Sequence, residues 1–523
     1  MKKQIQIYDT TLRDGSQAEE VNFTVEDKLR IAEKLDWLGV HYIEAGWPGA
    51  SPKDTEFFAR ARTELKLKKS RLVAFGSTRR AGTPVEKDKI LNDLLAAETK
   101  TICIFGKTWD LHVKTALKIP LAENLALIRE SVAYLKKNKR EVIFDAEHFF
   151  DGFKGNKKYA LEAIKAAASG GADRIVLCDT NGGTLPDEIS KIVSAVRKKI
   201  RTPMGIHCHN DTESGVSNSI AAVIAGVTQV QGTINGIGER CGNANLCSIV
   251  ANLELKLGYE TIGKKRLERL RDVSSFVDEL ANRSPNRHQP YVGKAAFAHK
   301  GGVHVDAILK NSRTYEHIDP KSVGNAQRIL LSELSGAATI VHKAKEFGLD
   351  LSAGNPRVRE LLSQLKEMEN RGYEFEGAEA SFEMNVKKAL GQYKPHFVLH
   401  DFKVTDTITA EGKGGATSEA IIHLAVDGHE ETATAQGVGP VHALDRALRK
   451  ALERFYPQIA SLKLLDYKVR VLPAGSGTAA TVRVLIECGD GESKWGTVGV
   501  SENIIHASYQ ALVDSIDFKL MKG

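Results

Sequence analysis

No stretch of the 523-residue sequence comes near the roughly 20 uninterrupted apolar residues that a membrane-spanning helix requires. The opening Met1-Lys2-Lys3 leads directly into a strand-like segment, without the apolar core of a secretory signal. We therefore expect a cytoplasmic protein that does not engage a membrane. The length and the 42% share of hydrophobic residues predict a large core divided among two or three domains.

Cysteine is also scarce. The six cysteines are scattered without any CxxC pair, which argues against a zinc ribbon and against thioredoxin-like redox chemistry. We expect free thiols, most of them buried. The formal net charge of +7 is mild for this length, so nucleic acid is not an expected partner. A small positive surplus suits anionic small-molecule substrates, including those that carry phosphates.

Between residue 4 and about residue 260, short β-branched runs alternate with longer amphipathic segments, as in repeated βα units around a parallel sheet. One amphipathic segment predicts a helix from Val25 to Leu38, with Thr24 as N-cap and Gly39 as stop. Eight βα units in this length are typical of a TIM (β/α)8 barrel, although a doubly wound sheet gives the same alternation. The predicted strands are 4–9, 41–45, 71–75, 100–105, 141–145, 174–178, 204–209 and 229–234.

Unusual polar residues gather where these predicted strands end. Active sites of TIM barrels lie at the C-terminal ends of the strands, so this placement favours the barrel over the doubly wound sheet. The residues are Arg13, Asp14, Glu44, Glu147, Asp179, Thr180, His207, His209 and Asn235.

The rest of the chain predicts two further regions, giving domains at 1–265, 266–390 and 391–523. The middle region reads as helical segments interrupted by an aperiodic stretch from Asn282 to Tyr291. The last region is β-rich and contains a weak internal repeat, in which residues 401–404 are echoed by 466–469. We expect an α+β domain built from two similar halves, with no catalytic residues of its own.

His207 and His209 are the most informative pair in the sequence. Side chains alternate along a strand, so both imidazoles lie on one face about 7 Å apart and can converge on one metal. On its own the pair is also compatible with core or surface histidines. Similarly, Arg13 and Asp14 alone read as a surface ion pair, but beside two imidazoles Asp14 becomes an oxygen ligand and Arg13 an anion partner.

The segment 235–243, NGIGERCGN, completes this group. Its glycines do not have the GxGxxG spacing of a dinucleotide-binding loop. We interpret it as a tight turn at the barrel mouth, with Asn243 able to add a carbonyl ligand to the metal.

DTTLRDGSQ at 9–17, GIHCHND at 205–211 and NGIGERCGN at 235–243 together resemble the signatures of the DRE-TIM metallolyase superfamily. The resemblance continues through the later regions and points to the acyl-CoA-condensing synthases of this superfamily, which form isopropylmalate, homocitrate or citramalate. The stretch 44–54, EAGWPGASPKD, is most similar to the citramalate synthases. That resemblance implies condensation of acetyl-CoA with pyruvate and hydrolysis of the thioester, in isoleucine biosynthesis.

The same resemblance implies roles for individual residues. Asp14, His207, His209 and Asn243 would hold a divalent metal, which mixed oxygen and nitrogen ligands leave open as Mg²⁺, Mn²⁺, Co²⁺ or Zn²⁺. The 2-oxo acid would chelate that metal. Arg13 would stabilise developing negative charge.

Three further residues take roles from the resemblance. Thr180 would bind the substrate carboxylate, and Glu147 would act near the acetyl-CoA methyl group. In the segments GGVHVDA at 301–307 and YEHIDP at 315–320, His304 and Tyr315 would take part in proton transfer, either in their own subunit or in the neighbouring one.

Substrate size is expected to depend on residues of the third and fourth predicted strands. Ile104, with Ile102, Phe75 and Ser77, is a candidate to line the space for the substrate side chain. Asp145 also faces the predicted substrate site, and it departs from the pattern of some citramalate synthases, which have tyrosine there.

Three alternatives stay open. An isopropylmalate synthase would need room for an isopropyl group instead of a methyl group. A hydroxymethylglutaryl-CoA-lyase-like carbon-carbon lyase would resemble the barrel alone, and a non-catalytic amino-acid sensor would use only the C-terminal repeat. The resemblance further implies a homodimer whose C-terminal regulatory domain binds isoleucine.

Overall fold

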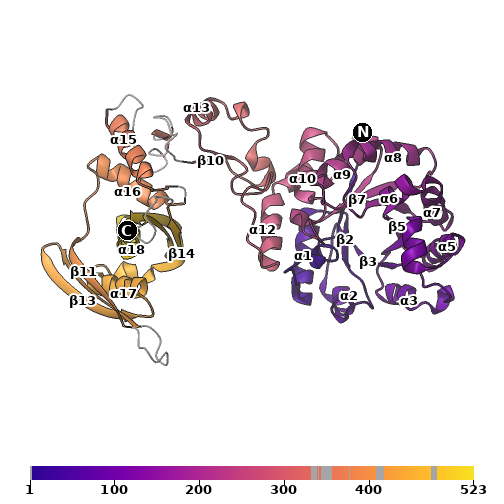
Figure 1. The fold of residues 1–523 in the computed structure, drawn as a ribbon, viewed down its shortest axis with the longest axis horizontal. Helices are drawn as coiled ribbons and strands as arrows, with labels where there is room; N and C mark the ends of the chain where they lie inside the picture. The colour runs from indigo at the N-terminus through magenta and orange to yellow at the C-terminus, as the bar shows by residue number, and fades with distance from the viewer. Residues whose placement is uncertain are drawn as a thin grey trace. The chain divides into compact units, whose positions relative to one another are not determined.

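The structure, a computed structural model, describes residues 3–330, 339, 341–342, 345, 356–375, 377–407, 417–472 and 480–522. The chain forms two compact units (Figure 1). The first comprises Met1–Phe297 with Glu316–Gln327, and the second comprises Ala298–Tyr315 with Arg328–Gly523. Within the described ranges, no helix has the length and apolar character needed to span a membrane.

Eight parallel strands of the first unit close into a barrel, which confirms the predicted TIM fold. Closure is direct, because β1 pairs with β2 on one side and with β8 on the other. The strands are β1 (Gln6–Asp9), β2 (Tyr42–Gly46), β3 (Arg71–Ser77), β4 (Thr101–Lys107), β5 (Glu141–Glu147), β6 (Arg174–Asp179), β7 (Met204–Cys208) and β8 (Gln229–Gly232).

Helices alternate with these strands along the chain. The first, α1 (Val25–Leu38), has the predicted bounds: Thr24 and Asp27 form a capping box, and Gly39 ends the helix in the left-handed conformation. The others are α2 (Pro52–Glu64), α3 (Lys89–Ala96), α4 (Asp110–His112), α5 (Leu121–Lys137), α6 (Phe149–Gly155), α7 (Lys157–Ser169), α8 (Pro186–Arg197), α9 (Gly215–Ala225), α10 (Leu246–Ala251), α11 (Lys264–Leu267) and α12 (Leu270–Leu280).

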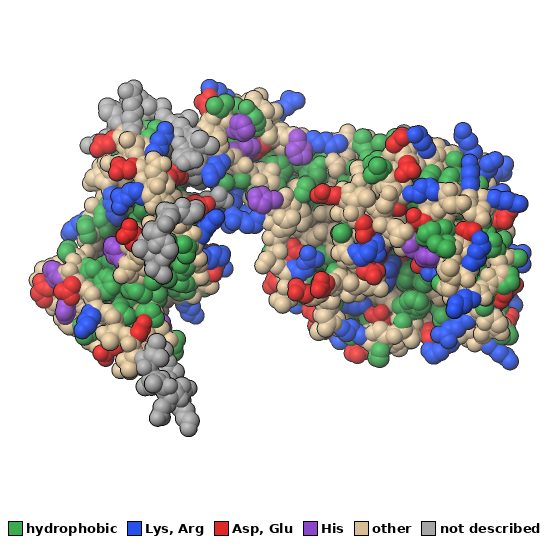
Figure 2. All heavy atoms as spheres, in the orientation of Figure 1, with side chains coloured by type: hydrophobic (Ala, Val, Ile, Leu, Met, Phe, Trp, Pro, Cys, Tyr) green, Lys and Arg blue, Asp and Glu red, His purple; other side chains and the backbone are tan. Residues whose placement is uncertain are grey.

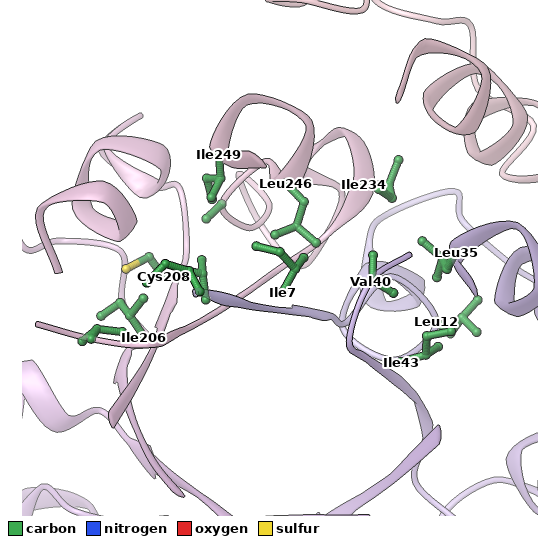
Figure 3. Packing of buried hydrophobic residues seen from close by; sticks show 14 of the residues in the cluster. Ile7, Leu12, Leu35, Val40, Ile43, Ile206, Cys208, Ile234, Leu246 and Ile249 are labelled. Carbon is green, nitrogen blue, oxygen red and sulfur yellow. The ribbon is translucent and has the colours of Figure 1, made fainter. Parts of the chain in front are cut away.

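The barrel strands are buried on both faces. Outward-facing side chains such as Ile7, Ile43 and Ile206 pack against helix residues such as Leu35 and Leu246 (Figure 3). Inward-facing side chains form a separate cluster inside the barrel, which contains Tyr8, Tyr42, Val73, Phe75, Cys103, Ile143, Val176 and Cys178. The alternation between inward-facing and outward-facing positions along each strand therefore decides which side chains reach the barrel mouth from inside the barrel.

The region after the barrel is mainly helical, with α13 (Gly302–Lys310), α15 (Pro356–Asn370) and α16 (Glu379–Ala389). The sequence predicted no strand here, and that expectation was wrong in one detail. Two-residue strands β9 (Ala298–His299) and β10 (Arg328–Ile329) pair in parallel. They are too short to show the alternation by which strands are recognised.

The C-terminal part consists of two βββα halves, as the repeat predicted. The first half contains β11 (Val398–Thr407), β12 (Thr417–Val426), β13 (His429–Gly437) and α17 (Pro440–Leu452); the second contains β14 (Lys463–Val471), β15 (Val482–Gly489), β16 (Lys494–Ser501) and α18 (Ile504–Lys522). Each half is a three-stranded antiparallel sheet with its own helix, and both share one hydrophobic core. A register shift precedes Asp401 in β11 and Asp466 in β14, where the sequence repeat begins.

Candidate active site

A cavity of about 390 Å³ opens at the C-terminal ends of the barrel strands. On the face shown in Figure 2, lysine and arginine side chains are interspersed with aspartate and glutamate over the first unit. The cavity has a more specific composition than this surface, because it combines acids, imidazoles, an arginine and aromatic rings. The predicted residues Arg13, Asp14, Asp145, Glu147, Thr180, His207 and His209 all line it.

Asp14, His207 and His209 converge on one point of this cavity. The Nε2 atoms of His207 and His209 lie 3.3 Å and 3.8 Å from Oδ2 of Asp14, and the two imidazole centroids are 5.1 Å apart. All three side chains are buried and lie close enough together to share one ion. His207 is on β7, whereas His209 lies just beyond the strand, held by a bridge to Asn243.

Several buried polar atoms of these residues, and of Asn243 beside His209, have no hydrogen-bond partner among the described residues. They are Oδ1 of Asp14, Nδ1 of His209, and both side-chain amide atoms of Asn243, which is 1% exposed. Buried polar atoms are normally satisfied, so these atoms indicate a missing ligand. A carboxylate, an amide oxygen and two imidazoles form a donor set that fits a divalent cation.

The surrounding charges and burial keep Asp14 and His209 in the form that binds a metal. Burial alone would raise the pKa of Asp14, but Arg13 and the two imidazoles outweigh it and hold the pKa well below its usual range. Burial and the neighbouring His207 lower the pKa of His209 to about 3. Asp14 is therefore ionised and His209 neutral, and these are the states in which both side chains bind a metal.

Arg13 is fixed from three sides. Its Nε donates to Oε1 of Glu44 at 2.6 Å, its Nη1 lies 3.3 Å from Asp14, and its guanidinium lies 3.8 Å from the centroid of the Phe75 ring. Glu44, in the middle of β2, also accepts a hydrogen bond from the hydroxyl of Tyr8. Burial opposes the charge of Arg13, but Glu44 and Asp14 more than compensate and raise its pKa.

Thr180 and Glu147 stand on the opposite side of the cavity. The backbone N–H of His148 donates to Oγ1 of Thr180 at 2.9 Å, so the Thr180 hydroxyl hydrogen remains available to a ligand. Oε2 of Glu147 pairs with Nζ of Lys107 at 2.5 Å. Lys107 was not among the predicted site residues, and a lysine at the end of a strand gives no signal that separates it from surface lysines.

His304 and Tyr315 belong to the second compact unit. Their rings stack with centroids 4.0 Å apart, and both side chains are exposed. The structure thus brings these two predicted residues to each other.

Ile104 does not line the cavity, and its predicted position was wrong. It lies in the cluster between the barrel and its helices, as Ile102 does. Its neighbour Phe105 faces the cavity instead, together with Phe75 and Trp47. These three rings lie 5.5 to 5.9 Å apart, forming one aromatic wall.

Gln231 on β8 is the most important residue that the sequence did not reveal. It pairs in register with His207, its side-chain oxygen faces Nδ1 of His207 at 3.0 Å as an acceptor, and its NH₂ group donates to Asp145 at 3.1 Å. Asp145 is 4% exposed, and burial together with Glu44 raises its pKa to about 6. The alternation of side chains along the strands could have revealed Gln231, since Gln231 and His207 are inward-facing residues of adjacent strands.

Family models match three consecutive parts of the chain. The HMGL-like model matches residues 4–277, the homocitrate synthase post-HMGL domain-like model matches 291–373, and the LeuA allosteric (dimerisation) domain model matches 376–520.

Full-length relatives are also found. The (R)-citramalate synthase of Geobacter sulfurreducens is 58% identical, over 99% of this chain and 98% of its own. That of Aquifex aeolicus is 54% identical, over 100% and 99% of the two chains. A probable 2-isopropylmalate synthase of Methanopyrus kandleri is 33% identical, over 99% and 98%.

Proposed function

The chain belongs to the HMGL-like family and, within it, to the (R)-citramalate synthases, and from this premise we propose that it condenses acetyl-CoA with pyruvate, releasing citramalate and CoA. The observation that carries the proposal is the convergence of Asp14, His207 and His209 beside Arg13 in one cavity. The enzyme is thus an acyltransferase that converts the acyl group into an alkyl group on transfer.

Asp14, His207, His209 and Asn243 would hold the divalent metal. When bound, such a metal polarises the keto group of a chelating 2-oxo acid and fixes which face is open to attack. The unpartnered atoms of Asp14 and Asn243 support this assignment. Mg²⁺, Mn²⁺, Co²⁺ and Zn²⁺ all accept such ligands.

Arg13 and Thr180 bind and orient the substrate. The Arg13 guanidinium is already positioned by Glu44 before substrate arrives, so it stabilises the developing alkoxide without reorganisation. The Thr180 hydroxyl donates to the pyruvate carboxylate, because its oxygen is already occupied by the N–H of His148.

Glu147 acts at the acetyl-CoA methyl group. Its ion pair with Lys107 holds the carboxylate at the cavity wall. A thioester methyl group is a weak carbon acid, so its deprotonation needs a positioned base together with charge stabilisation. For proton transfer we propose His304 and Tyr315, whose rings stack on each other, because their segments resemble those of the synthases.

The aromatic wall selects for pyruvate. Phe75, Phe105 and Trp47 occupy the side of the cavity next to Arg13, where a methyl group fits more easily than an isopropyl group. Each methylene of mismatch costs about 1 to 3 kcal/mol, so weak turnover of 2-oxobutanoate is also expected.

The C-terminal halves support two further proposals. The match to the LeuA allosteric (dimerisation) domain supports a homodimer, and isoleucine is the effector expected for a citramalate-forming enzyme.

A thiol-release assay tests the proposed reaction. CoA release from acetyl-CoA should be fastest with pyruvate, should stop with a chelator and should return when a divalent metal is added. Asp14→Asn should lower turnover by at least about 100-fold while the circular dichroism spectrum stays unchanged. Fastest release with 2-oxoisovalerate or 2-oxoglutarate, or chelator-insensitive activity, would contradict the proposal.

A further inference from the structure

Gln231 lies between a proposed metal ligand and a buried acid. Its side chain is 0% exposed, and its amide contacts Nδ1 of His207 at 3.0 Å and Oδ1 of Asp145 at 3.1 Å. The three side chains come from three inward-facing positions, on β7, β8 and β5. Nδ1 of His207 thus points away from Asp14, and Nε2 points toward it.

The direction of each hydrogen bond in this row follows from the carboxylate at its end. Nε2 of Gln231 donates to Oδ1 of Asp145, and a carboxylate oxygen accepts that hydrogen bond, so the NH₂ group of Gln231 faces Asp145. The amide oxygen then faces His207, and Nδ1 of His207 must carry the hydrogen that this oxygen accepts. Nε2, which lies 3.3 Å from Asp14, is left with a lone pair for a metal.

We infer that Gln231 is a positioning residue that holds His207 in the tautomer with its hydrogen on Nδ1, and that Asp145 sets the orientation of the Gln231 amide. This inference rests on the proposed metal site. Metal-binding histidines generally donate their second N–H to a fixed acceptor, and loss of that acceptor typically weakens metal binding about 10- to 100-fold.

Asp145 consequently has a role that does not depend on touching the substrate. A tyrosine at this position has a hydroxyl that both donates and accepts, so it would not fix the amide. A carboxylate does, because it accepts only. This gives a physical meaning to the departure at position 145.

The chain offers a matched control for Gln231. Gln229 lies two residues earlier on β8, is also 0% exposed and faces Gly205 instead of His207 in the register. Neither of its side-chain amide atoms has a hydrogen-bond partner among the described residues. Gln229→Met therefore makes the same chemical change in the same strand without touching the His207 row.

Titration of metal-free protein with Co²⁺, followed by visible absorption, tests the inference. Gln231→Met should weaken Co²⁺ binding about 10- to 100-fold. Gln231→Glu keeps an acceptor for Nδ1 and should restore binding to within about threefold of wild type. Gln229→Met should bind Co²⁺ as the wild type does.

A double-mutant cycle tests the part played by Asp145. Asp145→Leu should weaken Co²⁺ binding, and Asp145→Leu combined with Gln231→Met should be no weaker than Gln231→Met alone, because Asp145 acts through Gln231. Additive losses would overturn the Asp145 step. Wild-type affinity in Gln231→Met would overturn the inference but leave the proposed function standing, whereas absence of Co²⁺ binding by the wild type would overturn both.

Discussion

Arg13 interacts with three carboxylates, those of Asp14, Glu44 and Asp145, of which Asp14 and Asp145 line the cavity. The three acids are at most 4% exposed, and burial together with Glu44 raises the pKa of Asp145 to about 6. Burying unpaired negative charge is costly unless a positive charge compensates it. A divalent cation next to Asp14 supplies that charge, so the electrostatic balance agrees with the unpartnered donor atoms.

Thr180 provides a prediction about substrate binding. Thr180→Val removes the hydroxyl while keeping the shape, so the KM for pyruvate should rise about 10- to 150-fold, corresponding to one lost charge-assisted hydrogen bond of about 1.5 to 3 kcal/mol. Steady-state kinetics with pyruvate as the varied substrate measures the effect. Thr180→Ser should retain most of the affinity, and an unchanged KM in Thr180→Val would exclude the contact.

Phe105 provides a prediction about substrate size. Phe105→Ala removes one ring of the aromatic wall and should raise the kcat/KM for 2-oxoisovalerate relative to pyruvate about 10-fold or more. Phe75 is less suitable, because Arg13 lies over its ring. Val142→Ala, at an outward-facing position of β5, is the control and should leave the ratio unchanged. The assignment of the wall fails if Phe105→Ala leaves the ratio of the two substrates unchanged.

At the scale of the element, the sequence predicted where helices and strands begin and end better than it predicted which side of a strand each side chain faces. The capping residues Thr24 and Gly39 define α1 to the residue, because their effect on the backbone is local. The facing of Ile104 was missed because β4 is apolar on both faces. Strands buried on both sides are continuous apolar runs in the sequence. Which of their residues face the barrel interior is therefore known only from the closed barrel.

The pairing of β1 with β2 carries a pH-dependent contribution to stability. Nδ1 of His41 accepts a hydrogen bond from the N–H of Ile7 at 3.0 Å, which requires neutral imidazole. Burial and the neighbouring Arg266 lower the pKa of His41 to about 4. His41 becomes protonated near pH 6.5 in the unfolded chain but only near pH 4 in the folded chain. The contribution of neutral His41 to folding stability is therefore complete above pH 6.5 and is lost as the pH falls toward 4.

His41→Asn should flatten this dependence. The Asn side-chain oxygen replaces Nδ1 as acceptor and does not titrate. Chemical denaturation at pH 8 and pH 4.5 should show that the wild type loses up to about 3 kcal/mol more than the variant over this interval. Equal losses in both proteins would show that His41 does not contribute.

At the scale of the whole molecule, the repeat was visible in sequence because both halves begin with the same short motif after the same irregularity in the strand. The division of the chain into units was not. Residues 298–315 belong to the second unit while 316–327 belong to the first, and this interleaving depends on contacts between segments far apart in sequence. No local pattern encodes such contacts.

The division determines how the proposed isoleucine regulation is best tested. Phe382 and Val386 of α16 share a hydrophobic cluster with Val498 and Val500 of β16. A cut near residue 390 would separate α16 from that strand. Exposing that cluster would destabilise the remaining chain for reasons unrelated to the effector. A cut after Gln327 keeps the whole barrel unit and both C-terminal halves intact, and it separates only residues 298–315 from the rest of the second unit.

Isothermal titration with isoleucine should show binding to the full chain and none to a chain that ends at Gln327, because the effector is expected between the two βββα halves. Circular dichroism checks that the shorter chain is folded, and D-isoleucine is the control ligand for the full chain. A fragment of residues 328–523 should retain the binding, since its halves share one core. Isoleucine binding by the chain that ends at Gln327 would place the effector site on the barrel unit instead.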